Sequence, residues 1–121
     1  MSLQISVRES GDVAILDLRG RWTLEDDELL KRHLQTLVAD GMRKILLNLA
    51  DVRQIDSSGV SSMVRMRTSL RRQGGDVRLL RPSQHAMDVL RVLHLLEMIP
   101  MFEEENLAVA SFVRLGDLAK T

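Results

Sequence analysis

The pattern of hydrophobic and polar residues begins with two short strands. Residues 3–7 alternate between apolar and polar side chains, which is typical of a half-buried strand. Ser10-Gly11-Asp12 forms a turn signal, and residues 13–18 form a second apolar stretch that ends near Gly20. The short connection predicts that the two strands form an antiparallel hairpin.

The next segment has helical spacing from about residue 24 or 25 to residue 39. Thr23 is placed to cap this helix, and four acidic residues at 25–28 load its first turn with negative charge, which the helix dipole favours. Asp40-Gly41 is a stop signal. The residues expected to face the core share one helical stripe: Leu30, Leu34, Leu37 and Val38.

Residues 45–49 are almost wholly apolar, as expected for a central parallel strand that is covered on both faces. Asn48 is the polar exception, and we expect its side chain to be a hydrogen-bonded structural group. A short loop should follow this strand and open a helix with a helical pattern over residues 60–73, which ends at Gly74-Gly75.

The remaining chain predicts a strand at 77–80 and a helix capped by Ser83 that ends near residue 95 or 96, with an inner face of Met87, Leu90 and Leu93. An edge strand at 99–102, marked by Pro100, and a terminal helix at about 107–118 should follow. The order β-β-α-β-α-β-α-β-α predicts an α/β domain. We expect one domain over residues 1–121, with a mostly parallel sheet, an N-terminal antiparallel hairpin and about four helices packed on it.

Ile55-Asp56-Ser57-Ser58-Gly59-Val60 stands between the central strand and the following helix, a place where binding sites concentrate in α/β sheets. Helical spacing places a core stripe on one side of this helix: Val60, Met63, Met66 and Leu70. The opposite, outward side carries Ser58, Ser61, Ser62, Arg65, Ser69 and Arg72.

Two interpretations of these hydroxyls remain open. In the first, Asp56, Ser57 or Ser58 only caps the helix by accepting a backbone N–H. In the second, a hydroxyl is phosphorylated, since a phosphate of about −1.5 to −2 charges would meet unpaired N–H groups and the positive end of the helix dipole.

These residues also carry a family resemblance. Asp56-Ser57-Ser58-Gly59-Val60, after the apolar strand, resembles the signature of the STAS domain and, more narrowly, of bacterial anti-sigma factor antagonists. The resemblance implies a STAS-like fold over most of the chain. It also implies that Ser58 is phosphorylated by a partner anti-sigma factor with serine kinase activity, with Ser57 a weaker candidate and a serine phosphatase as a further partner.

The resemblance implies a partner-binding surface with the following members: Asp56, Ser57, Ser58, Gly59, Ser61, Ser62, Arg65, Trp22 and Thr23. One position departs from the family pattern, because Thr23 stands where the family usually has an aspartate. Trp22 beside it is open to two interpretations, a core residue or an interface anchor, since tryptophan is enriched in interface hot spots.

Composition narrows the function classes. The 121 residues include 17 basic and 17 acidic side chains, so no net charge favours nucleic acid or an anionic membrane. Cysteine is absent, which excludes disulfides and thiolate chemistry, and no apolar run reaches the roughly 20 residues of a membrane span. We expect a cytoplasmic protein without a cofactor or metal, and no direct nucleic-acid contact.

No pattern in the chain indicates an enzyme. His33, His85 and His94 fall on predicted helices without metal-ligand spacing, and neither a Gly-x-Ser-x-Gly elbow nor a Gly-x-x-x-x-Gly-Lys phosphate loop occurs. The leading hypothesis is therefore a phospho-switched binding module. The alternative is a STAS scaffold that is never phosphorylated, as a subunit of a transporter or of a stress-signalling complex.

Overall fold

The structure is a computed structural model that describes residues 3–112. Within this range the chain forms strands and helices in the following order: β1 (Gln4–Ser10), β2 (Val13–Trp22), α1 (Asp27–Ala39), β3 (Lys44–Ile55), α2 (Ser57–Arg72), β4 (Asp76–Leu80), α3 (Gln84–Val92), β5 (Met101–Phe102) and α4 (Glu105–Ala110). Short 3-10 turns, η1 (Leu24–Asp26) and η2 (Leu95–Glu97), precede α1 and follow α3.

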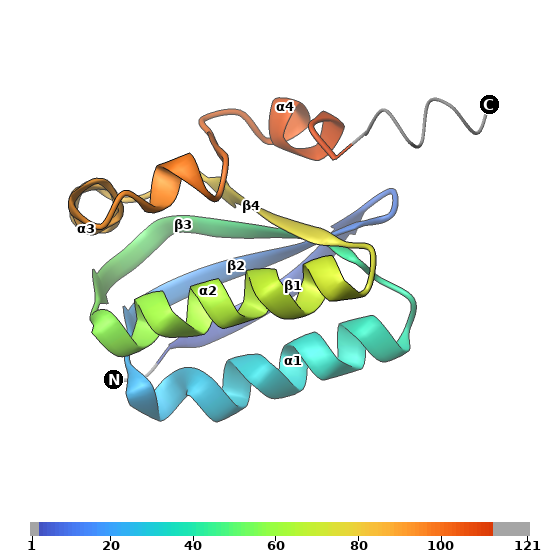
Figure 1. The fold of residues 1–121 in the computed structure, drawn as a ribbon, viewed down its shortest axis with the longest axis horizontal. Coiled ribbons are helices and arrows are strands. Elements are labelled where there is room, and N and C mark those ends of the chain that lie inside the picture. The colour runs from blue at the N-terminus through green and yellow to red at the C-terminus, as the bar shows by residue number, and fades with distance from the viewer. Residues whose placement is uncertain (1–2, 113–121) are drawn as a thin grey trace.

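The strands form one sheet in the order β1-β2-β3-β4-β5 (Figure 1). β1 pairs antiparallel with β2, and each later pair is parallel. The predicted α/β architecture, with an N-terminal antiparallel hairpin followed by parallel strands, is confirmed.

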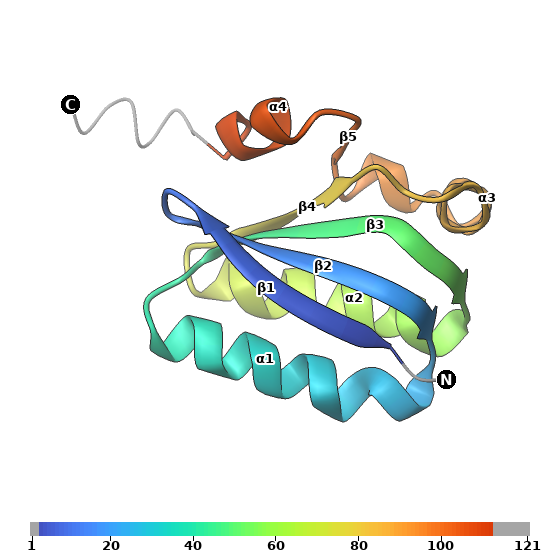
Figure 2. The same ribbon diagram turned by 180° about the vertical axis from the view of Figure 1, so that it is seen from behind.

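The helices lie on both sides of the sheet: α1 and α2 run side by side along one face, and α3 and α4 lie on the opposite side (Figures 1 and 2). The larger core fills the space under α1 and α2 and includes the predicted stripes of both helices, such as Leu30 and Met63. A smaller cluster lies under α4 and consists of Val13, Ile15, Leu46, Leu80, Ala108 and Phe112.

Two strands are longer than predicted, and the expected loop before α2 is absent. β2 continues to Trp22, and β3 continues past Leu49 to Ile55, so only Asp56 separates β3 from α2. Register shifts between the two strands interrupt the alternation of side chains. From Ala50 onward only Val52 and Ile55 are buried, and pairs of exposed residues separate them. This spacing hides the second half of β3 from a search for apolar runs or strict alternation.

The C-terminal part is also less regular than predicted. α3 is capped by Ser83 as expected, but it ends at Val92 because His94 adopts a left-handed conformation with φ of 57°. Leu93, expected on the inner face, is 49% exposed. The last strand is confined to Met101–Phe102 at the sheet edge, and α4 begins at Glu105, so the predicted helix beyond residue 112 lies outside the described residues.

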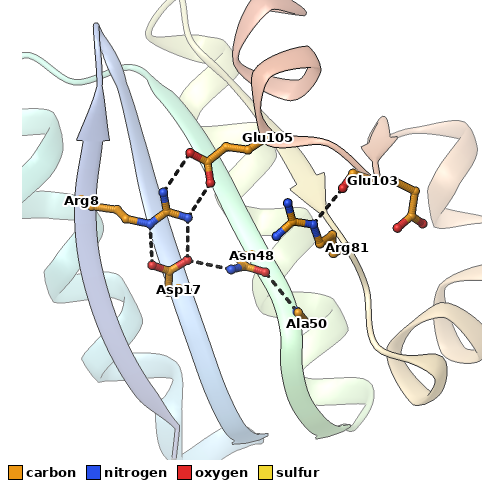
Figure 3. A network of polar contacts seen from close by, with 7 residues as sticks. All are labelled: Arg8, Asp17, Asn48, Ala50, Arg81, Glu103 and Glu105. Carbon is orange, nitrogen blue, oxygen red and sulfur yellow. Dashed lines mark hydrogen bonds and ion pairs between the residues drawn. The ribbon is translucent and has the colours of Figure 1, made fainter.

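A polar network fixes the start of α4 to the hairpin (Figure 3). The guanidinium of Arg8 donates to Asp17 at 2.7 Å and to Glu105 at 2.6 Å, and the Asn48 amide also donates to Asp17 at 2.7 Å. The hydrogen bonds from Arg8 lower the pKa of both carboxyl groups. The expectation that Asn48 is a hydrogen-bonded structural group is confirmed.

Candidate functional site

The first turn of α2 is capped by Asp56. Its Oδ1 accepts from the backbone N–H of Gly59 at 2.9 Å, so capping is confirmed for Asp56 and not for the two serines. Ser57 and Ser58 occupy the first two helical positions, whose N–H groups have no partner within a helix. The hydroxyls of Ser57 and Ser58 make no hydrogen bond to the described residues, which leaves both side chains chemically unengaged.

Gly59 allows this turn to pack directly against the end of β2. A Cβ at this position would lie 2.7 Å from the backbone oxygen of Trp22 and 2.8 Å from Cγ1 of Ile55. The Trp22 oxygen also accepts from the N–H of Asp56 at 3.3 Å. The glycine of the motif is therefore a steric requirement: only a residue without a side chain lets the strand end and the helix start meet so closely.

The connection from β2 to α1 is held by a buried carboxylate. Asp26, which is 1% exposed, accepts from the N–H groups of Leu3 and Thr23, each at 2.8 Å, and from the Thr23 hydroxyl at 3.2 Å. The sequence pattern placed Asp26 among surface acids that favour the helix dipole, and the structure corrects this. Thr23 is half-buried and uses its hydroxyl internally in this contact.

The second turn of α2 is tied to α1 through Asp27. Arg65 donates to Asp27 at 3.1 Å. The pKa of the Asp27 carboxyl is lowered mainly by a hydrogen bond from Ser62 and to a smaller extent by that from Arg65. Ser62 is 7% exposed, so its predicted outward orientation is wrong. The helical spacing alone could not reveal this because the covering residues belong to α1.

The predicted partner-binding residues therefore separate by accessibility. Ser57, Ser61 and Arg65 are exposed, Ser58 and Asp56 are half-exposed, and Gly59 is buried. Trp22 has no exposed surface, so it is a core residue in this structure and its side chain does not form part of the surface. What remains accessible is a polar strip along α2 that begins at Asp56 and continues to Arg65.

Leu24 is a surface residue of this region that the sequence pattern did not single out. It is 68% exposed in η1, and η1 contacts α2. The helical pattern merged Leu24 with the α1 segment, and a single exposed leucine is ordinary on protein surfaces. It therefore adds an apolar side chain to the exposed surface of the segment that contacts α2.

The histidines do not gather at this region. His33 and His85 lie on α1 and α3, as predicted. His94 was also predicted on a helix, but it follows the end of α3. Across residues 3–112, no group of three or more histidine and acidic side chains is arranged to hold a metal ion. No helix in this range combines the length and apolarity needed to cross a membrane.

Comparison with protein families gives a match to the STAS domain over residues 4–108. A comparison with curated proteins gives no match. Among solved structures, an anti-sigma factor antagonist from Mycobacterium paratuberculosis is similar at 14% identity and a TM-score of 0.79, over 91% of this chain and 93% of the other. A Thermotoga maritima protein, described as a candidate anti-sigma factor antagonist, is 25% identical with a TM-score of 0.82, over 91% and 95%.

SpoIIAA, an anti-sigma factor antagonist whose structure is known in unphosphorylated form, aligns at 20% identity and a TM-score of 0.74, over 92% of this chain and all of the other. The phosphorylated form of the Bacillus protein aligns at 20% identity and a TM-score of 0.69, over 89% and 98%. The similarity to these SpoIIAA structures establishes the fold.

Proposed function

Because this chain belongs to the STAS domain family, we propose that it is an anti-sigma factor antagonist controlled by phosphorylation of Ser58. The observation that carries the proposal is the state of Ser58. This residue is half-exposed on the first turn of α2, and its hydroxyl has no hydrogen bond to the described residues, since Asp56 caps the helix. SpoIIAA, which shares the fold, is known in both unphosphorylated and phosphorylated forms.

In the unphosphorylated state, the polar strip from Asp56 to Arg65 docks an anti-sigma factor that is also a serine kinase. Docking withdraws the anti-sigma factor from its sigma factor, which releases the sigma factor for transcription. The partner supplies ATP and the catalytic groups, and this chain supplies only the acceptor hydroxyl of Ser58, so catalysis is not assigned to this chain. A serine phosphatase restores the hydroxyl.

Phosphorylation changes the charge of the docking surface and leaves the fold intact. A phosphate on Ser58 adds about −1.5 to −2 charges at the positive end of α2, which stabilises the dianion by about 0.3–1 kcal/mol. Burying the dianion against a partner surface that fits a hydroxyl costs several kcal/mol. Since about 1.4 kcal/mol is a tenfold change in affinity, the bound partner should be released.

The test compares parent, Ser58→Ala, Ser58→Asp and Ser57→Asp chains as tagged baits in the native cells, with co-purified proteins quantified by mass spectrometry. Ser58→Asp should keep the circular dichroism spectrum of the parent. Its affinity for an anti-sigma factor kinase should fall by about a hundredfold or more. Ser58→Ala should retain the kinase, and Ser57→Asp, the matched charge on the neighbouring residue, should lose less.

The same experiment distinguishes this proposal from the alternative hypothesis of a STAS scaffold that is never phosphorylated. A Ser58→Asp chain that binds its partners as the parent does would contradict the phosphorylation switch. If those partners are transporter subunits or a multi-subunit assembly, the result would instead establish the constitutive scaffold.

A further inference from the structure

A groove runs along the outer surface between α1 and α2. Its volume is about 500 Å³, and its walls extend from Asp27 to Ala39 on α1 and from Ser62 to Gln73 on α2. At 1.5 Å per helical residue, twelve residues correspond to a length of about 18 Å. The groove therefore has the volume of a small-molecule site, typically about 300–1,000 Å³, in an elongated shape.

The floor of the groove is apolar and its rims are polar. Leu30, Met66 and Leu70 form the buried floor, at 1%, 4% and 2% exposure. Leu34 and Val38 continue it along α1 and are half-buried. Because the floor is already buried, the accessible apolar surface comes mainly from Leu34 and Val38. A narrow, unbranched hydrocarbon chain suits this surface, because it gains from apolar burial there and requires no hydrogen-bond partner.

The two ends of the groove differ in charge. One end carries Lys31 and Arg65 against the single carboxylate of Asp27, whose oxygen already accepts from Arg65 at 3.1 Å. Lys31 makes no hydrogen bond or contact ion pair with the described residues and acts on Asp27 only through its charge. Two positive side chains and one negative side chain therefore line this end. The other end is lined by neutral side chains, of which Ala39 and Gln73 are the last on each helix.

We propose that this groove binds a free long-chain fatty acid. The hydrocarbon chain lies against Leu34 and Val38, above the buried floor, and the carboxylate lies at the Lys31 end. The length of the groove matches an extended acyl chain, and the single excess positive charge at one end complements a single anionic head group. Because Arg65 belongs both to the groove and to the polar strip on α2, a bound fatty acid and a protein partner would compete at that end.

The first test is a chain-length series on the purified full chain. Octanoate, decanoate, dodecanoate and tetradecanoate, each below its critical micelle concentration, are titrated by isothermal calorimetry. Affinity should rise by about two- to fourfold for each added methylene until the groove is filled. Backbone amide shifts by NMR should concentrate on residues 27–39 of α1 and 62–73 of α2. An affinity that does not depend on chain length would overturn the proposal.

The second test uses two adjacent positions on α2. Ser69→Trp places a bulky ring in the groove and should reduce dodecanoate affinity at least tenfold, whereas Thr68→Trp, on an exposed position outside the lining, should leave it unchanged. Both variants should show the parent circular dichroism spectrum with and without the fatty acid. Equal loss in both, unfolding by the ligand, or binding to Ser69→Trp as to the parent would overturn the proposal.

The third test concerns the head group and the independence of the two sites. Lys31→Gln should remove the preference for dodecanoate over dodecanol, because the neutral alcohol does not use the charge. Ser58→Ala should bind dodecanoate as the parent does, so failure of the phosphorylation switch and failure of fatty-acid binding give different results. A Lys31→Gln chain that still prefers the carboxylate would contradict the assigned orientation and with it the proposed complementarity.

Discussion

The starts of α2 and α4 are two helix N-termini that the fold secures in opposite ways. α2 begins on a packed contact, with Gly59 against the Trp22 backbone and Asp56 as the cap. α4 has no side-chain cap, and its first residue, Glu105, is instead held by an ion pair to Arg8 of β1. At α4 the side chain of Glu105 holds the structure together, whereas at α2 the side chains of Ser57 and Ser58 are left free.

This difference indicates how a surface becomes available for binding. The packing of Gly59 and the carboxylate of Asp56 fix the start of α2. The neighbouring hydroxyls of Ser57 and Ser58 are therefore not needed to hold the structure. At α4, by contrast, the carboxylate of Glu105 is already engaged by Arg8. The comparison predicts that substitutions at α2 separate into those that break the packing and those that change only the surface.

The largest effect is expected for Gly59→Ala. The added methyl group would lie within 2.8 Å of both the Trp22 oxygen and Ile55, so the strand end and the helix start must move apart. Overpacking of this kind costs about 1–3 kcal/mol. Urea unfolding should show this loss, whereas Ser61→Ala on the exposed side should change the unfolding free energy by less than about 0.5 kcal/mol. Equal stability of the two variants would refute the steric role of Gly59.

Removal of the cap should have a smaller effect. Asp56→Ala leaves the N–H of Gly59 without its acceptor and should destabilise the domain by about 1 kcal/mol. Asp56→Asn keeps a side-chain oxygen and should recover most of this loss, which distinguishes hydrogen bonding from charge. Thermal unfolding of the three chains checks the order, and a stability of Asp56→Ala equal to that of the parent would contradict the assigned cap.

The smallest effect is expected at the ion pairs of α4. Arg8→Met should cost no more than about 1 kcal/mol at neutral pH, because the pairs are partly exposed and screened by solvent. Arg8 lowers the folded-state pKa of Asp17 and Glu105, so its stabilisation is present above their unfolded pKa values of about 4 and is lost as the pH falls through the lowered values.

The difference in unfolding free energy between parent and Arg8→Met should therefore be constant near pH 7 and shrink below about pH 4. It should also shrink at high salt, whereas the Gly59→Ala loss should not. Arg19→Met is the matched control, since Arg19 is exposed and makes no ion pair with the described residues. A difference between parent and Arg8→Met that grows as the solution becomes more acidic would show that the pairs are not the source.

The sequence predicted the elements that repeat a simple pattern and missed those that depend on contacts between distant segments. The hairpin, the α2 core stripe and the Ser83 cap follow from local spacing. The sequence predicted a loop in place of the second half of β3, because its consecutive exposed residues and irregular pairing with β2 conceal Val52 and Ile55. The end of α3 depends on the left-handed backbone conformation of His94, which cannot be predicted from the residue type.

The site shows the same division. The motif located the start of α2 correctly. The burial of Ser62 beside Asp27 of α1, and of Trp22 against Gly59, depends on contacts between segments that are distant in the chain. Asp26 looked like one of four surface acids and is a buried acceptor of three hydrogen bonds. Local periodicity therefore identified the element that carries the site and could not identify which of its side chains remain accessible.

The most direct test of the phosphorylation switch is intact-mass spectrometry with site mapping on the chain purified from its native cells, with and without phosphatase inhibitors. We predict one added phosphate, on Ser58, that increases with the inhibitors and is absent from Ser58→Ala. A chain that stays unmodified across growth and stress conditions, or that carries its phosphate on Ser57 or Ser61, would contradict the role assigned to Ser58.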